Sequence, residues 1–552
     1  MTGRLFADTV LLGCGAGSML APASGDGDRQ AVAVRGGRIV FVGPDADARE
    51  LIGGDTFVYE VAGRVVAPAV TDSHTHFHRA SVMEHMYLNF ERLEPDSVED
   101  VLDLVRQRAE TTPPTTWIQG DSLEARRLRE HRLPTRHELD AAAPGRHVVL
   151  RTVGRHALCA SSAALAAAGI DADTVAPPGG RIERDGTGEP NGILHEHGKL
   201  RLDMTRADTV IPKPDAKERQ AALEAGMRRL ATNGIVTIHD IVREPGEIAD
   251  YIDLDTSGRL KIRIRMYVRG RESQTPLEYV RALGLRRGFG SEWLRLAGIK
   301  LSIDGDTANK NSAVYEPYPG EPDNVGLLRL DSSELDEAVR LCHGAMLPVA
   351  IHAIGPRAVD MALDAIERAQ TVAPQIELTH RIEHAFFAQR GARLKRFAGL
   401  GVVWSTQASM LYSSADGWRA ATGDEFLEDV MPLRSALAEG VAVQLNSDYP
   451  CSPLDPSVGL QAAQRRTSRE GVVLAPDEAI TIDEAFGLMT RAPAVTVGED
   501  HLSGTLDVGK WGDVIVLSDT HDGEPGRPSG GSFAVDASFA GGELVFERSV
   551  GG

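Results

Sequence analysis

Eight apolar runs, each suited to one buried β-strand, recur along the middle of the chain and constrain its fold more than any other feature. Helix-length segments separate them, which is the pattern of parallel βα units. The runs occupy residues 65–76, 234–242, 261–268, 295–305, 347–355, 376–386, 401–407 and 441–448. Eight such units predict an α/β fold, a (β/α)8 TIM barrel of about 250 residues.

The spacing of the runs also predicts how the chain is divided. About 155 residues separate the first run from the second, far more than one βα connection needs. We therefore predict a large α/β insertion at 90–220, after the first barrel strand and capping the active site, within a barrel domain at 66–494. Short alternating strands in 1–65 and 495–552 predict a β-sandwich domain assembled from both termini.

Charge and cysteine content exclude several classes of partner. The 59 basic and 79 acidic residues give a formal net charge of −20, which repels nucleic acids and anionic membranes. The four cysteines show no C-x-x-C spacing and fit a reducing compartment. No run approaches the roughly 18 apolar residues of a membrane span. We expect a cytoplasmic protein that binds a small molecule, no nucleic acid and no membrane, with a homodimer left open.

Two histidines end the first run. His74 and His76 lie two residues apart in TDSHTHFH. The period of a strand puts both imidazoles on one face, and the carboxyl end of a barrel strand is where active sites lie. Neutral imidazole nitrogens are common zinc ligands, yet an isolated H-x-H also occurs as plain surface or core histidines.

Later runs end in comparable groups. His352 ends the fifth run, His384 the sixth and Asp448 the eighth. The carboxyl ends of all barrel strands meet at one end of the barrel, so these side chains converge with the two histidines of the first run. The sequence therefore predicts a metal centre made of four histidines and one carboxylate.

Lys300 ends the fourth run, in GIKLSIDG. A buried ammonium group is costly, and neighbouring cations make it more so. Two outcomes remain open on these grounds. Either Lys300 forms an ion pair with Asp304 or Asp306, or CO2 converts its amine to a carbamate, which is a bidentate oxygen ligand.

Four further residues are candidate substrate contacts. His239 ends the second run and either faces the substrate or is a core histidine bonded to Asp240. Gln407 ends the seventh run and either binds the substrate or fills the barrel mouth. His156 and Glu196 lie in the insertion, where they line the pocket or have a structural role.

Taken together, these motifs resemble the amidohydrolase superfamily, and more closely its YtcJ-like branch, which includes N-substituted formamide deformylases. The resemblance covers essentially the whole chain. The motifs that carry it are TDSHTHF (71–77), PTRHELD (134–140), GRHALCASSAAL (154–165), NGIVTIHD (233–240), IKLSIDG (299–305) followed by EPY (316–318), IHAIG (351–355), RIEHA (381–385), NSDYPCSPLDP (446–456) and GTLDVGKWGDVIVL (504–517).

The resemblance implies two divalent metal ions and a carboxylated Lys300 that bridges them. Zinc is the expected metal, with manganese and iron left open because sites of histidine and carboxylate bind all three. The ligands that it implies are His74, His76, Lys300, His352, His384 and Asp448. Departures concern the substrate: 304–318 lacks a Gly-Ser-Leu-Gly-type run, 116–127 lacks the usual aromatic residue after its glycine, and GRH replaces Asp-Gly-His, although His156 is kept.

The predicted function is metal-dependent hydrolysis of the C–N bond of an amide or N-substituted formamide. A metal-activated hydroxide would attack the carbonyl, with Asp448 as general acid and base. A biosynthetic hydrolase or cyclase acting on an amide-containing intermediate is an alternative. A deaminase of this architecture commonly needs a Glu a few residues after this histidine to protonate the ring nitrogen, and IHAIGPRAVD (351–360) has none, so deamination is less favoured. A non-enzymatic barrel would be expected to lack one or more of the six ligands, and none is missing.

Overall fold

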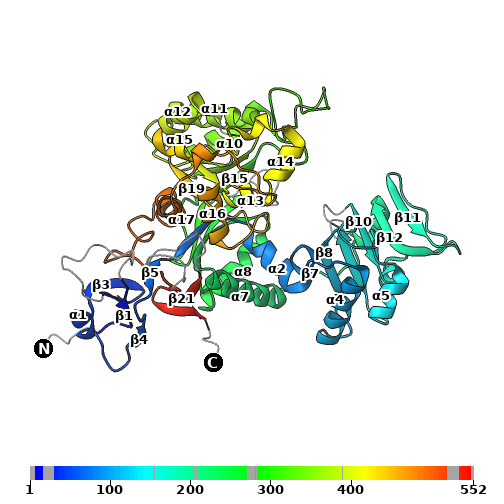
Figure 1. Ribbon diagram of the computed structural model, residues 1–552, viewed down its shortest axis with the longest axis horizontal. Helices are drawn as coiled ribbons and strands as arrows, with labels where there is room; N and C mark the ends of the chain where they lie inside the picture. The colour runs from blue at the N-terminus through cyan, green and yellow to red at the C-terminus, as the bar shows by residue number, and fades with distance from the viewer. Residues whose placement is uncertain are drawn as a thin grey trace. The chain divides into compact units, whose positions relative to one another are not determined.

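The computed structural model describes residues 6–15, 30–152, 156–203, 208–269, 280, 282–387, 390–518 and 534–548. The chain forms two compact units (Figure 1). The first consists of Met1–His78 and Gly226–Gly552, and the second of Arg79–Ala225. Each unit has its own sheets and its own buried apolar clusters.

Eight parallel strands form the barrel of the first unit. Their bounds are β6 Val70–Thr75, β13 Ile235–Val242, β14 Arg263–Arg269, β15 Leu294–Ser302, β16 Val349–Ala353, β17 Arg381–His384, β18 Val403–Thr406 and β19 Val443–Leu445. Each strand lies within or overlaps one of the eight predicted runs, because strands buried on both faces read as continuous apolar runs. The predicted TIM-barrel fold is confirmed.

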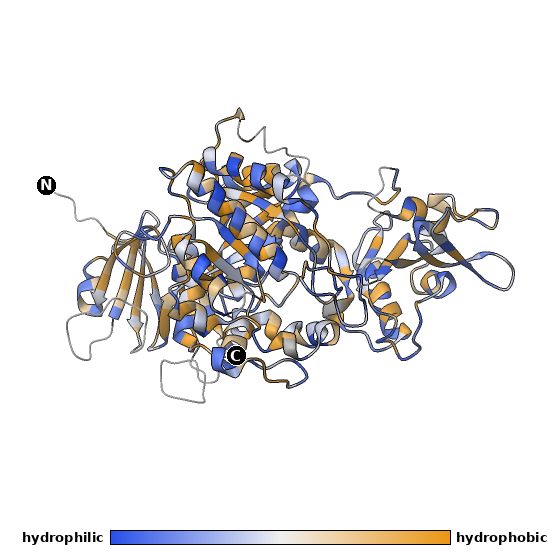
Figure 2. Ribbon diagram, turned by 90° about the horizontal axis from the view of Figure 1, so that it is seen from above, coloured by the Kyte–Doolittle hydropathy of each residue, from blue (hydrophilic) through white to orange (hydrophobic). Residues whose placement is uncertain are grey.

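Helices surround these strands. The main ones are α7 Ala216–Thr232, α8 Pro245–Thr256, α10 Ser332–Gly344, α11 Pro356–Val372, α12 Ala392–Gly399, α15 Leu433–Ala438, α16 Pro456–Arg465 and α17 Ile482–Thr496. On α11 the buried Val359, Leu363 and Ile366 follow the spacing of one helical face. Figure 2 shows hydrophilic and hydrophobic residues on the same helices. Among the described helices, none is long and apolar enough to cross a membrane.

The barrel closes between β19 and β6, which stand at the two ends of the eight-strand sheet. Just after β19, Tyr449 forms a parallel bridge with Thr75. The amide of Asp448 donates to the carbonyl of His74 at 2.9 Å, and the amide of His76 donates to the carbonyl of Tyr449 at 2.8 Å. Both bonds involve the backbone of predicted ligands, so closing the barrel also brings His74, His76 and Asp448 together.

Two four-stranded sheets combine both ends of the chain. The first has the order β3 (Arg38–Pro44), β2 (Gln30–Arg35), β1 (Thr9–Cys14) and β4 (Phe57–Glu60); the second has the order β22 (Glu543–Glu547), β21 (Val535–Ala540), β20 (Val514–Leu517) and β5 (Val65–Pro68). One apolar cluster, which includes Leu11, Val32 and Phe539, contains residues of both sheets. The N- and C-terminal segments therefore share a core, as the fold prediction requires.

The second unit is built on a six-stranded mixed sheet. Its order is β11 (Gly180–Arg184), β12 (Pro190–Glu196), β10 (Ala157–Ala160), β9 (Val148–Thr152), β8 (Ile118–Leu123) and β7 (Tyr87–Asn89). Strands β7, β8 and β9 are parallel, and the others pair antiparallel. The helices α4 (Val98–Thr111) and α5 (Arg136–Ala142) pack against this sheet. A capping box between Thr135 and Glu138 starts α5.

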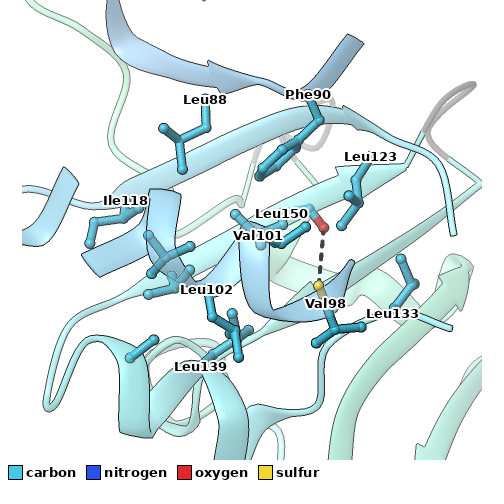
Figure 3. Close-up of a cluster of buried hydrophobic side chains, with 14 of the residues drawn as sticks. Leu88, Phe90, Val98, Val101, Leu102, Ile118, Leu123, Leu133, Leu139 and Leu150 are labelled. Atoms are coloured by element: carbon cyan, nitrogen blue, oxygen red, sulfur yellow. Dashed lines mark hydrogen bonds between the residues drawn. The ribbon is translucent and has the colours of Figure 1, made fainter. Parts of the chain in front are cut away.

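The apolar core of the second unit lies between these helices and one face of the sheet (Figure 3). Leu88, Ile118 and Leu150 from the strands pack in one cluster with Val101 of α4 and Leu139 of α5. Alternate residues of the strands enter this cluster, as the period of two requires. The insertion therefore has an α/β structure with a core of its own.

Replacement of Leu150 by alanine is expected to loosen the second unit. Leu150 is fully buried, and such a deletion typically costs about 2–5 kcal/mol because it leaves a cavity. Hydrogen exchange of residues 118–152, followed by mass spectrometry, would measure the loss as faster exchange. Val175→Ala is the control, because Val175 is 86% exposed in the same unit. Equal exchange in both variants would contradict the prediction.

Candidate metal centre

Six polar side chains lie at the carboxyl ends of the barrel strands. They are His74 on β6, His76 just after it, Lys300 on β15, His352 on β16, His384 at the end of β17, and Asp448 after β19. Four of them are buried, and His76 and His352 are partly exposed. The structure thus brings all six predicted ligands to one end of the barrel.

Three of the histidines, His74, His76 and His384, lie close to Asp448. Its Oδ1 lies 3.5 Å from Nε2 of His74 and 3.4 Å from Nε2 of His76. Ligand atoms of His74, His384 and Asp448 all lie within 4.8 Å of one another. Ligands at about 2.1 Å from one tetrahedral ion are separated by about 3.4 Å, so these separations suit a shared divalent cation.

The remaining candidates adjoin this group. Nζ of Lys300 lies 3.4 Å from Nε2 of His74, and no described ion pair joins it to Asp304 or Asp306. The ring centroid of His352 lies 4.5 Å from that of His384. Of the two outcomes left open for Lys300, the ion pair with Asp304 or Asp306 is not among the described contacts.

Hydrogen bonds hold the far sides of two histidine rings. Nδ1 of His74 lies 2.6 Å from Glu383 Oε2, and Nδ1 of His384 lies 2.9 Å from Gln407 Oε1. Metal-binding histidines commonly donate one ring N–H in this way and present the other nitrogen to the ion. Nδ1 of His76 and Oδ1 of Asp448 are buried without a described hydrogen bond, and such atoms are costly unless something binds them. The donor set therefore fits a cation.

Burial sets the charge states of the site. Burial, and then the charge of Lys300, lower the pKa of His74 to about 3, so this ring is neutral. Burial also lowers the pKa of His384, and it lowers the pKa of Lys300 to about 8. For Asp448, burial alone would raise the pKa, but the neighbouring histidines hold it below its ordinary value. Neutral imidazoles and a carboxylate are the forms that bind metal ions.

Two of the candidate ligands have a left-handed backbone. The φ angle is +71° at His384 and +53° at Asp448. Such conformations cost about 1–3 kcal/mol at residues other than glycine and concentrate at functional sites. Neighbouring groups fix both residues: the indole Nε1 of Trp404 donates to the carbonyl of His384 at 2.8 Å, and the amide of Asp448 is held by His74.

Sequence reasoning missed two charged residues on β17. Glu383 binds His74, and its Oε1 lies 2.5 Å from Nε of Arg381, whose guanidinium lies 3.9 Å from the ring centre of Tyr267. Burial alone would raise the pKa of Glu383, but Arg381 and His74 keep it well below its ordinary value. Two charged residues at strand period within RIEH (381–384) were the available signal.

His239 and Gln407, the two candidate substrate contacts on the barrel, both form hydrogen bonds within the protein. Arg381 donates to Nδ1 of the buried His239 at 3.0 Å, whereas Asp240 accepts bonds from Tyr251 and from the backbone amide of Phe77. Gln407 is fully buried and holds His384, so its side chain orients a candidate ligand.

The two candidates in the insertion pair with each other within the second unit. Nδ1 of His156 lies 2.8 Å from Oε1 of Glu196, and the amide of Glu196 donates to the carbonyl of His156 at 2.8 Å. Their side chains are 77% and 51% exposed. They therefore form an accessible polar pair at the ends of neighbouring strands.

The chain is similar to known proteins over most of its length. The chain is 30% identical over 500 residues to N-substituted formamide deformylase of Arthrobacter pascens, covering 88% of this chain and 90% of the relative. It is 26% identical over 544 residues to the putative amidohydrolase YtcJ of Bacillus subtilis, covering 95% and 97%. A crystal structure of an uncharacterised metal-dependent hydrolase from Pyrococcus furiosus matches the fold with a TM-score of 0.73 and 23% identity, covering 94% and 100%.

The match to a protein family covers most of the chain. The amidohydrolase family matches residues 58–527, a range that includes the barrel and every candidate ligand. The resemblance to the YtcJ-like branch is confirmed by the relatives of 30% and 26% identity. This protein belongs to the amidohydrolase family and is a hydrolase that acts on carbon–nitrogen bonds.

Proposed function

We propose that the protein is a metal-dependent amidohydrolase that cleaves the C–N bond of a small amide or N-substituted formamide. The observation that carries the proposal is the donor set around Asp448, where ligand atoms of His74 and His76 lie 3.5 Å and 3.4 Å from one carboxylate oxygen. The 30% identical relative named N-substituted formamide deformylase supports the substrate class.

We propose that the donors hold two divalent ions. His74, His76 and Asp448 would hold one divalent ion, and His352 with His384 would hold a second. A carboxylated Lys300 would be shared between the ions, and zinc suits the imidazole donors. Divalent ions bound there would polarise the substrate carbonyl and lower the pKa of a bound water to about 7.

Asp448 is the proposed general acid and base. Its Oδ1 lies beside the two histidine nitrogens and would bind the ion, which leaves Oδ2 to take a proton from the attacking water. The same oxygen would then protonate the leaving nitrogen. Glu383 and Gln407 keep the rings of His74 and His384 in place, and the burial of these groups excludes bulk water.

Asp448→Asn tests this function directly. The replacement keeps the shape but removes the base, so kcat should fall by about 10²-fold or more. The assay is hydrolysis of N-formyl, N-acyl and ureido compounds by metal-loaded protein. Asp424→Asn is the control, because Asp424 is exposed and bonded to Arg419. The function is contradicted if metal-loaded wild-type protein hydrolyses none of these compounds; near-normal turnover by Asp448→Asn with its metals bound would assign the proton transfer to another group.

Lys300 is proposed to react with CO2. The neutral amine attacks the carbon of CO2, one N–C bond forms, and one proton is released, which leaves a carbamate on Nζ. The pKa of about 8 makes neutral amine more abundant at pH 7 than for an exposed lysine. The product replaces a cation beside His74 with an anion that can bind metal.

Lys300→Ala should reduce bound metal from two ions to one and remove activity, with partial rescue by short carboxylic acids. Elemental analysis counts the ions, and mass spectrometry under non-denaturing conditions measures the added carboxyl group. Lys261→Ala is the control, because that lysine binds Glu543 on the surface. Two ions in Lys300→Ala, or one ion beside an unmodified Lys300, would contradict the bridged centre.

His156 and Glu196 are proposed to contact the substrate or to orient groups that do. Their exposure and mutual hydrogen bond support this role. His156→Ala should change the relative kcat/KM values among amide substrates, because a lost contact affects substrates unequally, while the bound metal is unchanged. His137→Ala, an exposed histidine of the same unit, is the control. Equal losses for every substrate would argue against a role in selectivity.

A further inference from the structure

Three buried aspartates near the candidate metal centre have no role in the proposed mechanism. Asp72 lies on β6, Asp240 on β13, and Asp304 follows β15. Their exposed fractions are 3%, 0% and 0%. Taking a carboxylate out of water costs several kcal/mol unless hydrogen bonds compensate, so its partners indicate what it is for. In all three cases the partners include backbone amides just after the carboxyl end of the adjacent strand.

Asp72 holds the segment around Asp448. Its Oδ1 accepts from the amide of Ser447 at 2.9 Å, and its Oδ2 accepts from the hydroxyl of Ser447. That hydroxyl in turn accepts from the amide of Tyr449 at 2.9 Å. The residues on both sides of Asp448 are therefore fixed, directly or through one hydroxyl, by a carboxylate on β6. This contact crosses the seam between the first and eighth strands.

Asp240 holds the residues on both sides of His76. Its Oδ1 accepts from the amide of Phe77 at 2.6 Å and from the hydroxyl of Thr75 at 3.1 Å, so both neighbours of His76 are bound. Its Oδ2 accepts from the hydroxyl of Tyr251 at 2.7 Å. Tyr251 thereby fixes the orientation of the carboxyl group. From β13, this group holds the residues at the carboxyl end of the adjacent strand β6.

Asp304 holds the exit of β16, which carries His352. Its Oδ1 accepts from the amide of Ile354 at 3.0 Å, and its Oδ2 accepts from the amides of Gly355 at 2.8 Å and Ala313 at 3.0 Å. Oδ1 also lies 3.5 Å from Nε2 of His352. All three hydrogen bonds come from backbone N–H groups, so an amide NH2 could not replace the oxygen that binds two of them.

We propose that Asp72, Asp240 and Asp304 are positioning residues of the metal centre. Each places a carboxyl group on or just after one barrel strand and fixes the backbone beside a ligand at the exit of the adjacent strand. Each of these carboxyl groups accepts at least two hydrogen bonds from the segment beside a ligand, which suits it to hold a strained residue such as Asp448. The inference rests on the proposed metal-binding function and adds that these carboxylates set metal affinity.

The test is the affinity of the metal-free protein for Co²⁺, measured by competition with a chromogenic chelator. Asp72→Asn, Asp240→Asn and Asp304→Asn should each raise the Kd by about 10- to 100-fold, as loss of groups that orient metal ligands commonly does. The largest rise is expected for Asp304→Asn. The visible absorption spectrum of bound Co²⁺ should also shift, because it reports ligand geometry.

Asp513→Asn is the matched control. Asp513 is 8% exposed and accepts from the amide of Gly541 at 2.7 Å, but it pairs with Arg263 and fixes no candidate ligand. It should lower Tm without changing the Kd or the spectrum of Co²⁺. Ser447→Ala and Tyr251→Phe are milder changes for the case in which an Asn variant does not fold; each should raise the Kd severalfold.

The outcomes separate the two proposals. Wild-type protein that binds no Co²⁺ would overturn the metal-dependent function itself. Wild-type protein that binds Co²⁺, together with folded variants of the three aspartates that keep the same Kd and spectrum, would overturn only the positioning role. An equal rise of the Kd in Asp513→Asn would also overturn it, because the effect would then follow from lost stability.

Discussion

The seam between β6 and β19 is the constraint on which the rest of the molecule depends. At this seam the barrel is closed by a bridge and two backbone bonds that flank His74, His76 and Asp448. Asp72 adds a side-chain contact to Ser447, a residue 375 positions away in the sequence. The same bonds that complete the sheet therefore also assemble half of the candidate ligands.

Much of this arrangement could be predicted from the sequence. Barrel strands buried on both faces read as apolar runs, and ligands at strand ends stand out because histidine, lysine and aspartate interrupt those runs. Glu383 was missed because its partner His74 is 309 positions away, and no local pattern reveals that pairing. Gln407 illustrates the same limit: its position was predicted, but its bond to His384 needed the structure.

Buried charged and polar side chains next to the candidate metal centre contact one another in a chain. Glu383 contacts both His74 and Arg381, and Arg381 contacts His239 and stacks on Tyr267. An unpaired charge in such surroundings would be strongly unfavourable, whereas these contacts compensate one another. The neutral histidines and the ionised carboxylates of the site are consequences of this arrangement, since each pKa shift depends on burial and on the neighbouring charge.

The distance in sequence between β6 and the residues after β19 has a consequence for protein synthesis. A ribosome makes the chain from its N-terminus, so His74 and His76 leave it long before Asp448 has been translated. Until then the first strand has no partner at the seam, and its two imidazoles cannot form the complete donor set. A metal ion bound by both strands would therefore be acquired only after translation has passed the eighth strand and the barrel has closed.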